Sequence, residues 1–203
     1  MLRNIIFDMG GVLIQFDPEY FVRCVDLDNP ADREILLQEI FRSKDWKLID
    51  KGVIDEAELE RRVFERIPER LQVAAHRMIF EWNQLAHPIE GMAELIRACK
   101  AAGMGIYLLS NASLRQPEYW PSIPGSECFD GTLVSAYELC VKPDVEIYRR
   151  ALNKFGLKAE ESIFIDDMAV NAEAAERVGI RGVHFRGDAA QLREALRALG
   201  VAV

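Results

Sequence analysis

The sequence has few of the features that mark several common classes of protein. It contains only four cysteines, Cys24, Cys99, Cys128 and Cys140. No two of them are spaced as C-x-x-C, so neither a zinc site nor a redox pair is predicted. We expect reduced thiols in a cytoplasmic protein. No apolar run approaches the roughly 20 residues that a membrane helix needs. We therefore expect neither a membrane span nor a secretion signal.

Positive charge is also scarce. The 25 Lys and Arg residues face 33 Asp and Glu residues, which gives a formal net charge of -8. Such a chain has no electrostatic footprint for nucleic acid and is repelled by anionic membrane surfaces. We expect neither as a partner, and the charge is compatible with a monomer or a homodimer. An anionic small substrate would need local cations or a metal ion.

What the chain has is an alternation of strand-like and helix-like segments. Glycines stand where several of the helical segments end. This alternation predicts an α/β fold with a Rossmann-like, doubly wound parallel sheet. The expected strands are 4–7, 105–109, 132–134, 162–165 and 182–185, and the expected helices are 89–102, 145–155, 169–178 and 189–199.

The segment 17–86 interrupts this alternation because its apolar residues recur only at helical spacing. Asp55 precedes one of its helical stretches and has the side chain of a good N-cap. We predict that 17–86 is a small helical cap domain, inserted after the first strand into a core made of 1–16 and 87–203. Its large aromatic residues Trp46 and Trp82 are expected to form the core of the cap rather than a ligand pocket.

Polar residues follow three of the predicted strands: Asp8, then Ser110-Asn111, then Asp166-Asp167. In open α/β sheets, ligands bind at the carboxyl ends of the strands. A single Asp or Ser-Asn at such a position is more often a turn former or a helix cap. The Asp166-Asp167 pair is different, because adjacent carboxylates repel each other. A hard divalent cation such as Mg²⁺, which takes oxygen ligands, would offset that repulsion.

Two further features fit a site for an anion at these strand ends. Gly10 and Gly11 follow Asp8 and allow the backbone to approach a ligand closely. Lys142 precedes Pro143 in a predicted loop before a helix. Alone it would be an ordinary surface lysine, but beside carboxylates and a metal it is suited to bind a phosphate oxygen as a point charge.

Taken in order, these segments resemble the four motifs of the haloacid dehalogenase superfamily. The first motif is matched by 7–13 (FDMGGVL), the second by 108–111 (LLSN), the third by Lys142-Pro143 and the fourth by 164–167 (FIDD) with Asn171. The resemblance extends along essentially the whole chain, and the helical insert is similar to the small C1-type cap. Within the superfamily, the sequence resembles the phosphatase branch, near sugar-1-phosphate phosphatases and the phosphatase-like N-terminal domain of epoxide hydrolases.

The resemblance implies that Asp8 is a nucleophile that attacks a phosphoryl group and forms an aspartyl-phosphate. It implies Mg²⁺ as cofactor, held by Asp8, the backbone carbonyl of Gly10 and Asp167. Asp166 would lie close by as a ligand or as a supporting group, and Asn171 would orient these residues.

The remaining implied roles concern the phosphate. Ser110 and the backbone of Asn111 would hold its oxygens, while Lys142 would balance charge on both Asp8 and the phosphate. The implied activity is hydrolysis of a small phosphorylated metabolite, such as a hexose 1-phosphate.

One position departs from the family pattern. Most phosphatases of this superfamily have a second Asp two residues after the nucleophile as general acid and base, and here that residue is Gly10. Such a group is worth about 10²–10⁴-fold in rate. The substrate could have a good leaving group, such as a sugar 1-phosphate or an acyl phosphate, another residue could take the role, or turnover could be slow. Asp17 is a candidate replacement, although Asp17-Pro18 is also typical of a helix start.

Other residues and functions are open as alternatives. His76, His87 and His184 are expected to be structural or surface residues, and Arg115 and Trp120 are candidates for the entrance to the site. A 2-haloacid dehalogenase would use the same nucleophile without a metal, but it would not need the paired acids. A phosphate-binding regulatory protein of low activity is the second alternative, because of Gly10.

Overall fold

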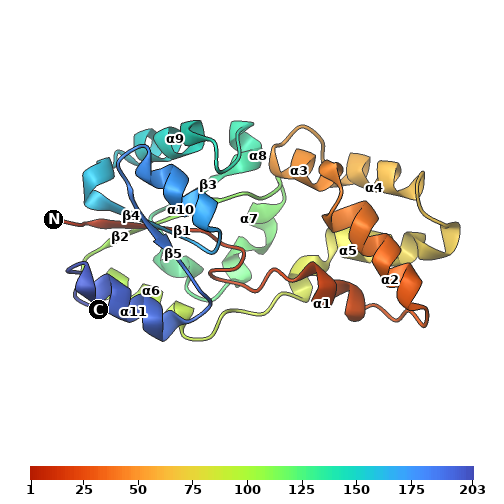
Figure 1. The fold of residues 1–203 in the computed structure, drawn as a ribbon, viewed down its shortest axis with the longest axis horizontal. Coiled ribbons are helices and arrows are strands. Elements are labelled where there is room, and N and C mark those ends of the chain that lie inside the picture. The colour runs from red at the N-terminus through yellow and green to blue at the C-terminus, as the bar shows by residue number, and fades with distance from the viewer.

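A five-stranded sheet forms the centre of the computed structural model, which describes residues 1–203 (Figure 1). All neighbouring strands run parallel, in the order β3-β2-β1-β4-β5. The strands are β1 (Asn4–Phe7), β2 (Gly105–Ser110), β3 (Gly131–Val134), β4 (Ser162–Asp166) and β5 (Arg181–His184). The predicted α/β fold with a Rossmann-like parallel sheet is confirmed.

Helices cover both faces of the sheet. On one face α6 (Met92–Ala101) and α11 (Ala189–Ala198) contribute to an apolar cluster that includes Ile5 and Phe7. On the other face α9 (Val145–Phe155) and α10 (Ala169–Glu176) pack around Ile6. Side chains of a strand point alternately to its two faces. Because both faces are buried, the strands are almost continuously apolar.

The helices that cover the two faces of the sheet lie where the sequence predicts them, although some of their ends are shifted. α9 has the predicted bounds; Asp144 caps it by accepting a hydrogen bond from the Glu146 amide at 3.0 Å, and Gly156 ends it with a φ of +65°. α6 begins at Met92 rather than at Ile89, because Gly91 precedes it with a φ of +78°. Such a left-handed conformation favours glycine and does not continue a helix.

Helices are the only long regular elements between β1 and α6, and they lie at the right of Figure 1. Its elements are α1 (Pro18–Arg23), α2 (Pro30–Leu36), a π-helical turn (Leu37–Phe41), α3 (Lys44–Asp50), α4 (Glu56–Phe64), α5 (Gln72–Phe80) and two short 3₁₀ turns (Glu69–Leu71 and Trp82–Gln84). Asp55 caps α4, as predicted, by accepting from the Glu58 amide at 2.8 Å. These helices pack around an apolar cluster of their own. The boundaries of the cap domain stay a prediction.

Polar contacts join these helices to the rest of the molecule near two short helices, α7 (Gln116–Tyr119) and α8 (Ser135–Glu138). The Ser135 hydroxyl donates to the carbonyl of Asp50 at 2.5 Å, and the Ser113 hydroxyl donates to the Glu56 carboxylate. The end of α3 and the start of α4 are therefore held against the edge of the sheet.

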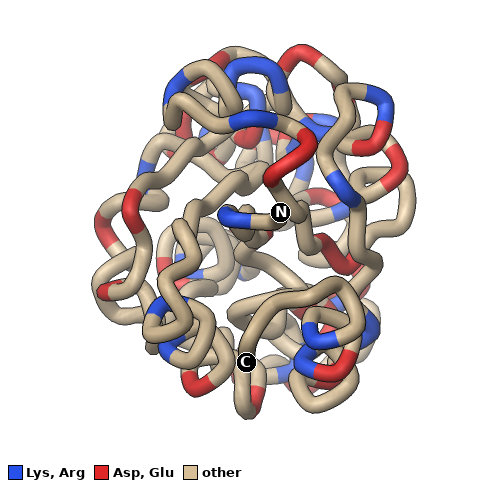
Figure 2. The backbone as a smooth tube through the Cα atoms, turned by 90° about the vertical axis from the view of Figure 1, so that its left-hand side faces the viewer, with Lys and Arg blue, Asp and Glu red and all other residues tan.

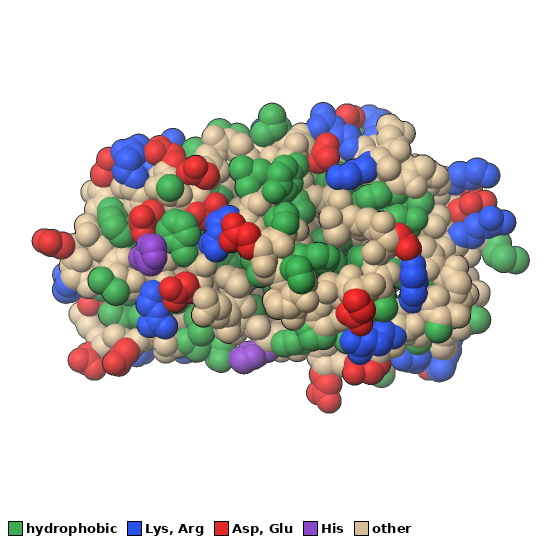
Figure 3. Space-filling model, turned by 180° about the vertical axis from the view of Figure 1, so that it is seen from behind, with side chains coloured by type: hydrophobic (Ala, Val, Ile, Leu, Met, Phe, Trp, Pro, Cys, Tyr) green, Lys and Arg blue, Asp and Glu red, His purple; other side chains and the backbone are tan.

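Charged residues of both signs are interspersed along the chain (Figure 2). They alternate with apolar side chains over the face drawn in Figure 3. None of the helices combines the length and the apolar character that crossing a membrane requires. All four cysteines are free thiols.

Candidate active site

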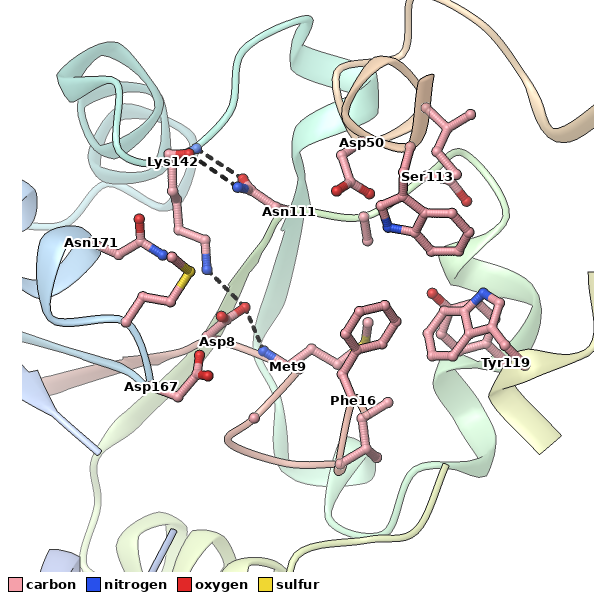
Figure 4. Close-up of a pocket in the computed structure, with 18 residues that line it drawn as sticks. Asp8, Met9, Phe16, Asp50, Asn111, Ser113, Tyr119, Lys142, Asp167 and Asn171 are labelled. Carbon is pink, nitrogen blue, oxygen red and sulfur yellow. Dashed lines mark hydrogen bonds and ion pairs between the residues drawn. The ribbon is translucent and has the colours of Figure 1, made fainter. Parts of the chain in front are cut away.

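The polar residues at the ends of β1, β2 and β4 converge at one edge of the sheet (Figure 4). The register aligns Phe7 of β1 with Leu108 of β2 and with Ile165 of β4. Asp8 therefore lies level with Asp166, the last residue of β4, whereas β2 continues to Ser110 before Asn111 leaves the sheet. The structure thus brings together the strand-end residues that the sequence pointed to.

Lys142 lies at the middle of this group. Its side chain is only 1% exposed, and its ammonium is 2.8 Å from Oδ1 of Asp8 and 2.7 Å from Oδ2 of Asp166. The side chain of Asn111 fixes the loop, accepting from the Lys142 amide at 2.8 Å and donating to the Lys142 carbonyl at 3.1 Å. Burial acts to lower the pKa of Lys142, but the two carboxylates outweigh it and the pKa lies above its usual value. Lys142 is therefore a fixed positive charge.

Asp166 is fully buried and its oxygens already have partners. Oδ1 accepts from the Met168 amide at 2.8 Å and from the Asn171 amide group at 3.0 Å, while Oδ2 faces Lys142. The Tyr148 hydroxyl holds Asn171 in turn, donating to its carbonyl at 2.8 Å. This geometry favours the supporting role for Asp166, which fixes Lys142 and Asn171.

Asp8 faces the cavity from the end of β1, and its Oδ1 accepts from the Met9 amide at 2.7 Å. Burial raises the pKa of Asp8 to about 7, although Lys142 opposes the rise, and the charge of Asp166 adds to it. Burial and the charge of Asp166 also raise the pKa of Asp167. The site therefore has more negative charge than its single lysine neutralises.

The residues fit a divalent cation. Carboxylate oxygens of Asp8, Asp166 and Asp167 lie within 4.8 Å of one another. When all three carboxylates are ionised, the single ammonium of Lys142 leaves two negative charges uncompensated. A hard divalent cation such as Mg²⁺ would neutralise both charges, and it prefers oxygen ligands of this kind. Gly11 allows this arrangement, because a Cβ there would lie 2.3 Å from Oδ2 of Asp167 and its φ is +71°. Gly10 lines the same cavity.

The cavity has a volume of about 250 Å³, and apolar side chains form the part that lies away from Asp8. They include Phe16, Trp46, Ile49, Trp82 and Tyr119. Phe16 packs edge-on against Trp82 at 5.1 Å between ring centroids. The expectation that Trp46 and Trp82 belong to the core of the helical segment is met in part. Trp46 is a buried member of the apolar cluster of that segment and Trp82 packs against the cluster, but both residues also line the cavity.

The candidates for the entrance lie elsewhere. Arg115 donates to the Phe80 carbonyl at 3.0 Å and pairs with Glu118 at 2.9 Å, and Trp120 packs against Phe129. Neither lines the cavity. Ser110 is 1% exposed and does not line it either, whereas Asn111, Ala112 and Ser113 do.

The candidate for the missing acid is not in the cavity. Asp17 caps α1, accepting from the Tyr20 amide at 2.9 Å. His76 contacts Glu60 and His87 contacts Tyr20, so both have structural partners. His184 contacts the backbone carbonyl of Asp167 at 2.9 Å and does not line the cavity.

One acidic residue of the cavity has no counterpart among the predicted site residues. Asp50, at the end of α3, lines the cavity, and Figure 4 shows its carboxylate pointing into it. Nothing in the sequence distinguishes Asp50 from the many other acids of the helical segment. Its place in the site depends on how that segment docks.

Comparison with known proteins agrees with this geometry. The sequence profile of the haloacid dehalogenase-like hydrolases matches residues 2–179, and the chain belongs to this family. The predicted superfamily and hydrolase class are confirmed. Among relatives, the sesquiterpene phosphatase astK of Aspergillus oryzae is 27% identical over 208 residues, which cover 96% of this chain and 95% of that protein. This relative agrees with the predicted phosphatase branch.

Solved structures share the fold. A haloacid dehalogenase family enzyme from Bacteroides thetaiotaomicron, in complex with magnesium and inorganic phosphate, has a TM-score of 0.68 at 22% identity, covering 95% of this chain and 99% of that one. The L-2-haloacid dehalogenase of Xanthobacter autotrophicus has a TM-score of 0.65 at 16% identity, covering 97% and 83%. At these identities the likeness is one of fold alone.

Proposed function

We propose that the protein is a magnesium-dependent phosphohydrolase that acts on a small phosphorylated metabolite through an aspartyl-phosphate on Asp8. The observation that carries the proposal is the cluster of Asp8, Asp166 and Asp167 around one buried lysine. It combines a carboxylate facing a cavity with a fixed cation and donors suited to Mg²⁺. The phosphatase relative and the magnesium and phosphate bound by a structural neighbour support it.

In this proposal Asp8, the Gly10 carbonyl and Asp167 hold the ion. When bound, Mg²⁺ would supply positive charge that keeps Asp8 ionised and offsets the charge of the phosphate. An oxygen of Asp8 forms a bond to phosphorus, and the bond from phosphorus to the leaving oxygen breaks. Lys142 neutralises charge on both partners.

The remaining assignments concern the phosphate and its release. The backbone of Asn111, which lines the cavity, holds phosphate oxygens, and Asn171 keeps Asp166 in place. Water then attacks the aspartyl-phosphate, which frees phosphate and restores Asp8.

The organic part of the substrate would occupy the aromatic chamber between the sheet edge and segment 17–86, which we propose acts as the cap. The chamber walls are Phe16, Trp46, Trp82 and Tyr119. Such walls favour an apolar organic group, since burying it against aromatic rings removes apolar surface from water. The sesquiterpene phosphatase among the relatives agrees with an apolar group.

The test is release of inorganic phosphate by the purified protein, with Mg²⁺ and with EDTA. The substrates are an isoprenoid monophosphate, sugar 1- and 6-phosphates and p-nitrophenyl phosphate. We expect activity only with Mg²⁺, and the highest kcat/KM for the isoprenoid phosphate. Asp8→Asn should lower kcat by more than about 10³-fold, as loss of a nucleophile does. Asp17→Asn is the control, because asparagine caps α1 equally well. Full activity of Asp8→Asn would refute the proposal.

The two alternatives give different results in the same assay. A haloacid dehalogenase would release halide from 2-chloropropionate in the presence of EDTA. A regulatory phosphate-binding protein would bind phosphate with Mg²⁺ and release none from any substrate. The cluster of three carboxylates favours the phosphohydrolase over the dehalogenase, because attack on carbon needs no divalent cation.

A further inference from the structure

Asp50 is the one carboxylate in the cavity that belongs to the cap. It ends α3, and its backbone carbonyl accepts from the Ser135 hydroxyl at 2.5 Å. That contact fixes the end of the helix and leaves the carboxylate free to face the cavity (Figure 4). Asp50 lies across the cavity from Asp8, on the side where an organic group attached to the phosphate would leave.

The position of Asp50 is costly for the fold. Its immediate surroundings include Trp46 and Ile49 of the same helix, and both line the same cavity. A carboxylate beside such groups is poorly solvated, and its charge has no ion-pair partner because Lys142 is already paired with Asp8 and Asp166. Unlike Asp17 and Asp55, it caps no helix. Stability therefore gives no reason for an acid at this position.

We propose that Asp50 is the general acid and base of the reaction, in the role that an Asp at position 10 would otherwise fill; this rests on the proposed function. In the first step, Asp8 bonds to phosphorus, the bond to the leaving oxygen breaks, and the carboxylic acid of Asp50 gives its proton to that oxygen. An alcohol leaves, and Asp50 becomes a carboxylate.

The second step restores both groups. The Asp50 carboxylate accepts a proton from the water that attacks the phosphorus of the aspartyl-phosphate. The bond between phosphorus and Asp8 breaks, inorganic phosphate leaves and Asp8 regains its charge. Protons balance over the cycle, because Asp50 gives one in the first step and takes one in the second.

The charged groups around Asp50 suit this role. Burial raises the pKa of Asp50 to about 7; Lys142 opposes the rise and Glu56, at the start of α4, adds to it. Tyr119 of α7 faces the same space, and burial raises its pKa, with the charge of Asp50 contributing, so it stays neutral. An acid with a pKa near the working pH is well placed both to give and to take a proton.

The experiment compares two substrates that differ in their need for a proton. An alkyl monophosphate must leave as an alcohol, whereas p-nitrophenolate leaves without a proton. The first step is followed as a pre-steady-state burst of released alcohol or nitrophenolate. Asp55→Asn is the matched control, since Asp55 is an acid of the same segment that caps α4, a role that asparagine fills equally well, and it does not line the cavity.

We expect Asp50→Asn to slow the burst with the alkyl phosphate by about 10²–10⁴-fold and the burst with p-nitrophenyl phosphate by less than about tenfold. With p-nitrophenyl phosphate, phosphorylated Asp8 should accumulate, because the first step stays fast while the second step lacks its base. With the alkyl phosphate, the wild-type rate should fall above about pH 7, where Asp50 loses its proton. This fall should be absent in Asp50→Asn. Asp50→Asn removes a poorly solvated charge, so its melting temperature should not fall, and Asp55→Asn should resemble wild type.

Equal slowing of both bursts would overturn the proposal, since Asp50 would then position groups rather than transfer protons. Unchanged turnover of the alkyl phosphate would overturn it too. Failure of the proposed function has a different signature: wild-type protein would release no phosphate with Mg²⁺, or Asp8→Asn would stay active.

Discussion

Replacing Lys142 by methionine should destabilise the fold strongly, and more so as pH rises. Methionine keeps much of the volume of the side chain but removes the charge between Asp8 and Asp166, which lie 2.8 and 2.7 Å from it. Removing one partner of a buried pair costs about 3–5 kcal/mol, because the other charge stays buried without compensation. For a chain of this size, 1 kcal/mol shifts Tm by about 2–4 °C, so the expected loss is about 6–20 °C.

The pH dependence follows from Asp8. Its pKa in the folded state is about 7, above its ordinary value of 3.8, so the carboxyl contributes a loss of stability as pH rises from about 4 to 7. Without Lys142 that pKa rises further, and the loss becomes larger and extends to higher pH. The difference in stability between variant and wild type should therefore be small near pH 5 and reach its full size near pH 8.

Urea unfolding of both proteins at these two pH values, with EDTA present, measures this difference. EDTA prevents a bound cation from replacing the lysine charge. Lys154→Met is the control, because Lys154 is 48% exposed and 3.9 Å from Glu138; such surface pairs contribute at most about 1 kcal/mol. A loss below about 1 kcal/mol at pH 8, or a loss independent of pH, would refute the reasoning.

Two predictions concern the glycines after the nucleophile. Gly11→Ala places a Cβ 2.3 Å from Oδ2 of Asp167, so Mg²⁺ affinity measured by calorimetry should fall more than about tenfold, as it does when groups that orient metal ligands are lost. Gly103 has a similar positive φ, and a Cβ there would have no atom within 4 Å, so Gly103→Ala should keep the Mg²⁺ affinity. An equal loss of affinity in the two variants would implicate backbone strain instead. Gly10→Asp has only Phe16 near its Cβ, at 3.4 Å, so the variant should fold. Combined with Asp50→Asn, it should restore part of the lost rate with alkyl phosphates; no rescue would show that an acid at position 10 does not reach the leaving oxygen.

The sequence was informative where local rules determine the structure. Strands of a parallel sheet end at one edge, so the residues after 4–7 and 162–165 had to meet once the sheet was predicted. Glycines with positive φ, such as Gly156, mark helix ends because few other residues adopt that conformation. The shift of the α6 start to Met92 follows from the same property of Gly91, which the helical periodicity alone does not reveal.

The parts that the sequence did not reveal depend on docking between segments far apart in the chain. Helical periodicity tells which side chains of α3 are apolar, but not that the last turn of α3 meets α8. Asp50 therefore looked like any other acid of the segment. Trp46 was expected inside the cap because it is large and apolar, and it does belong to the apolar cluster there, but it also lines the cavity. Arg115 was placed at the entrance, but its hydrogen bond to the Phe80 carbonyl makes it a link between segments.

The location of Asp50 has a consequence for the order of events in the site. An acid at position 10 would belong to the core, so it would be in the active site whether or not the cap is docked on the core. Asp50 comes instead from α3, whose end packs so closely on α8 that a Cβ at Gly52 would lie 2.1 Å from the Ala136 carbonyl oxygen. The same helix supplies Trp46 and Ile49 to the apolar wall. One docking contact thus completes the apolar chamber and brings the proton donor, so protonation of the leaving oxygen is coupled to enclosing the substrate and excluding water.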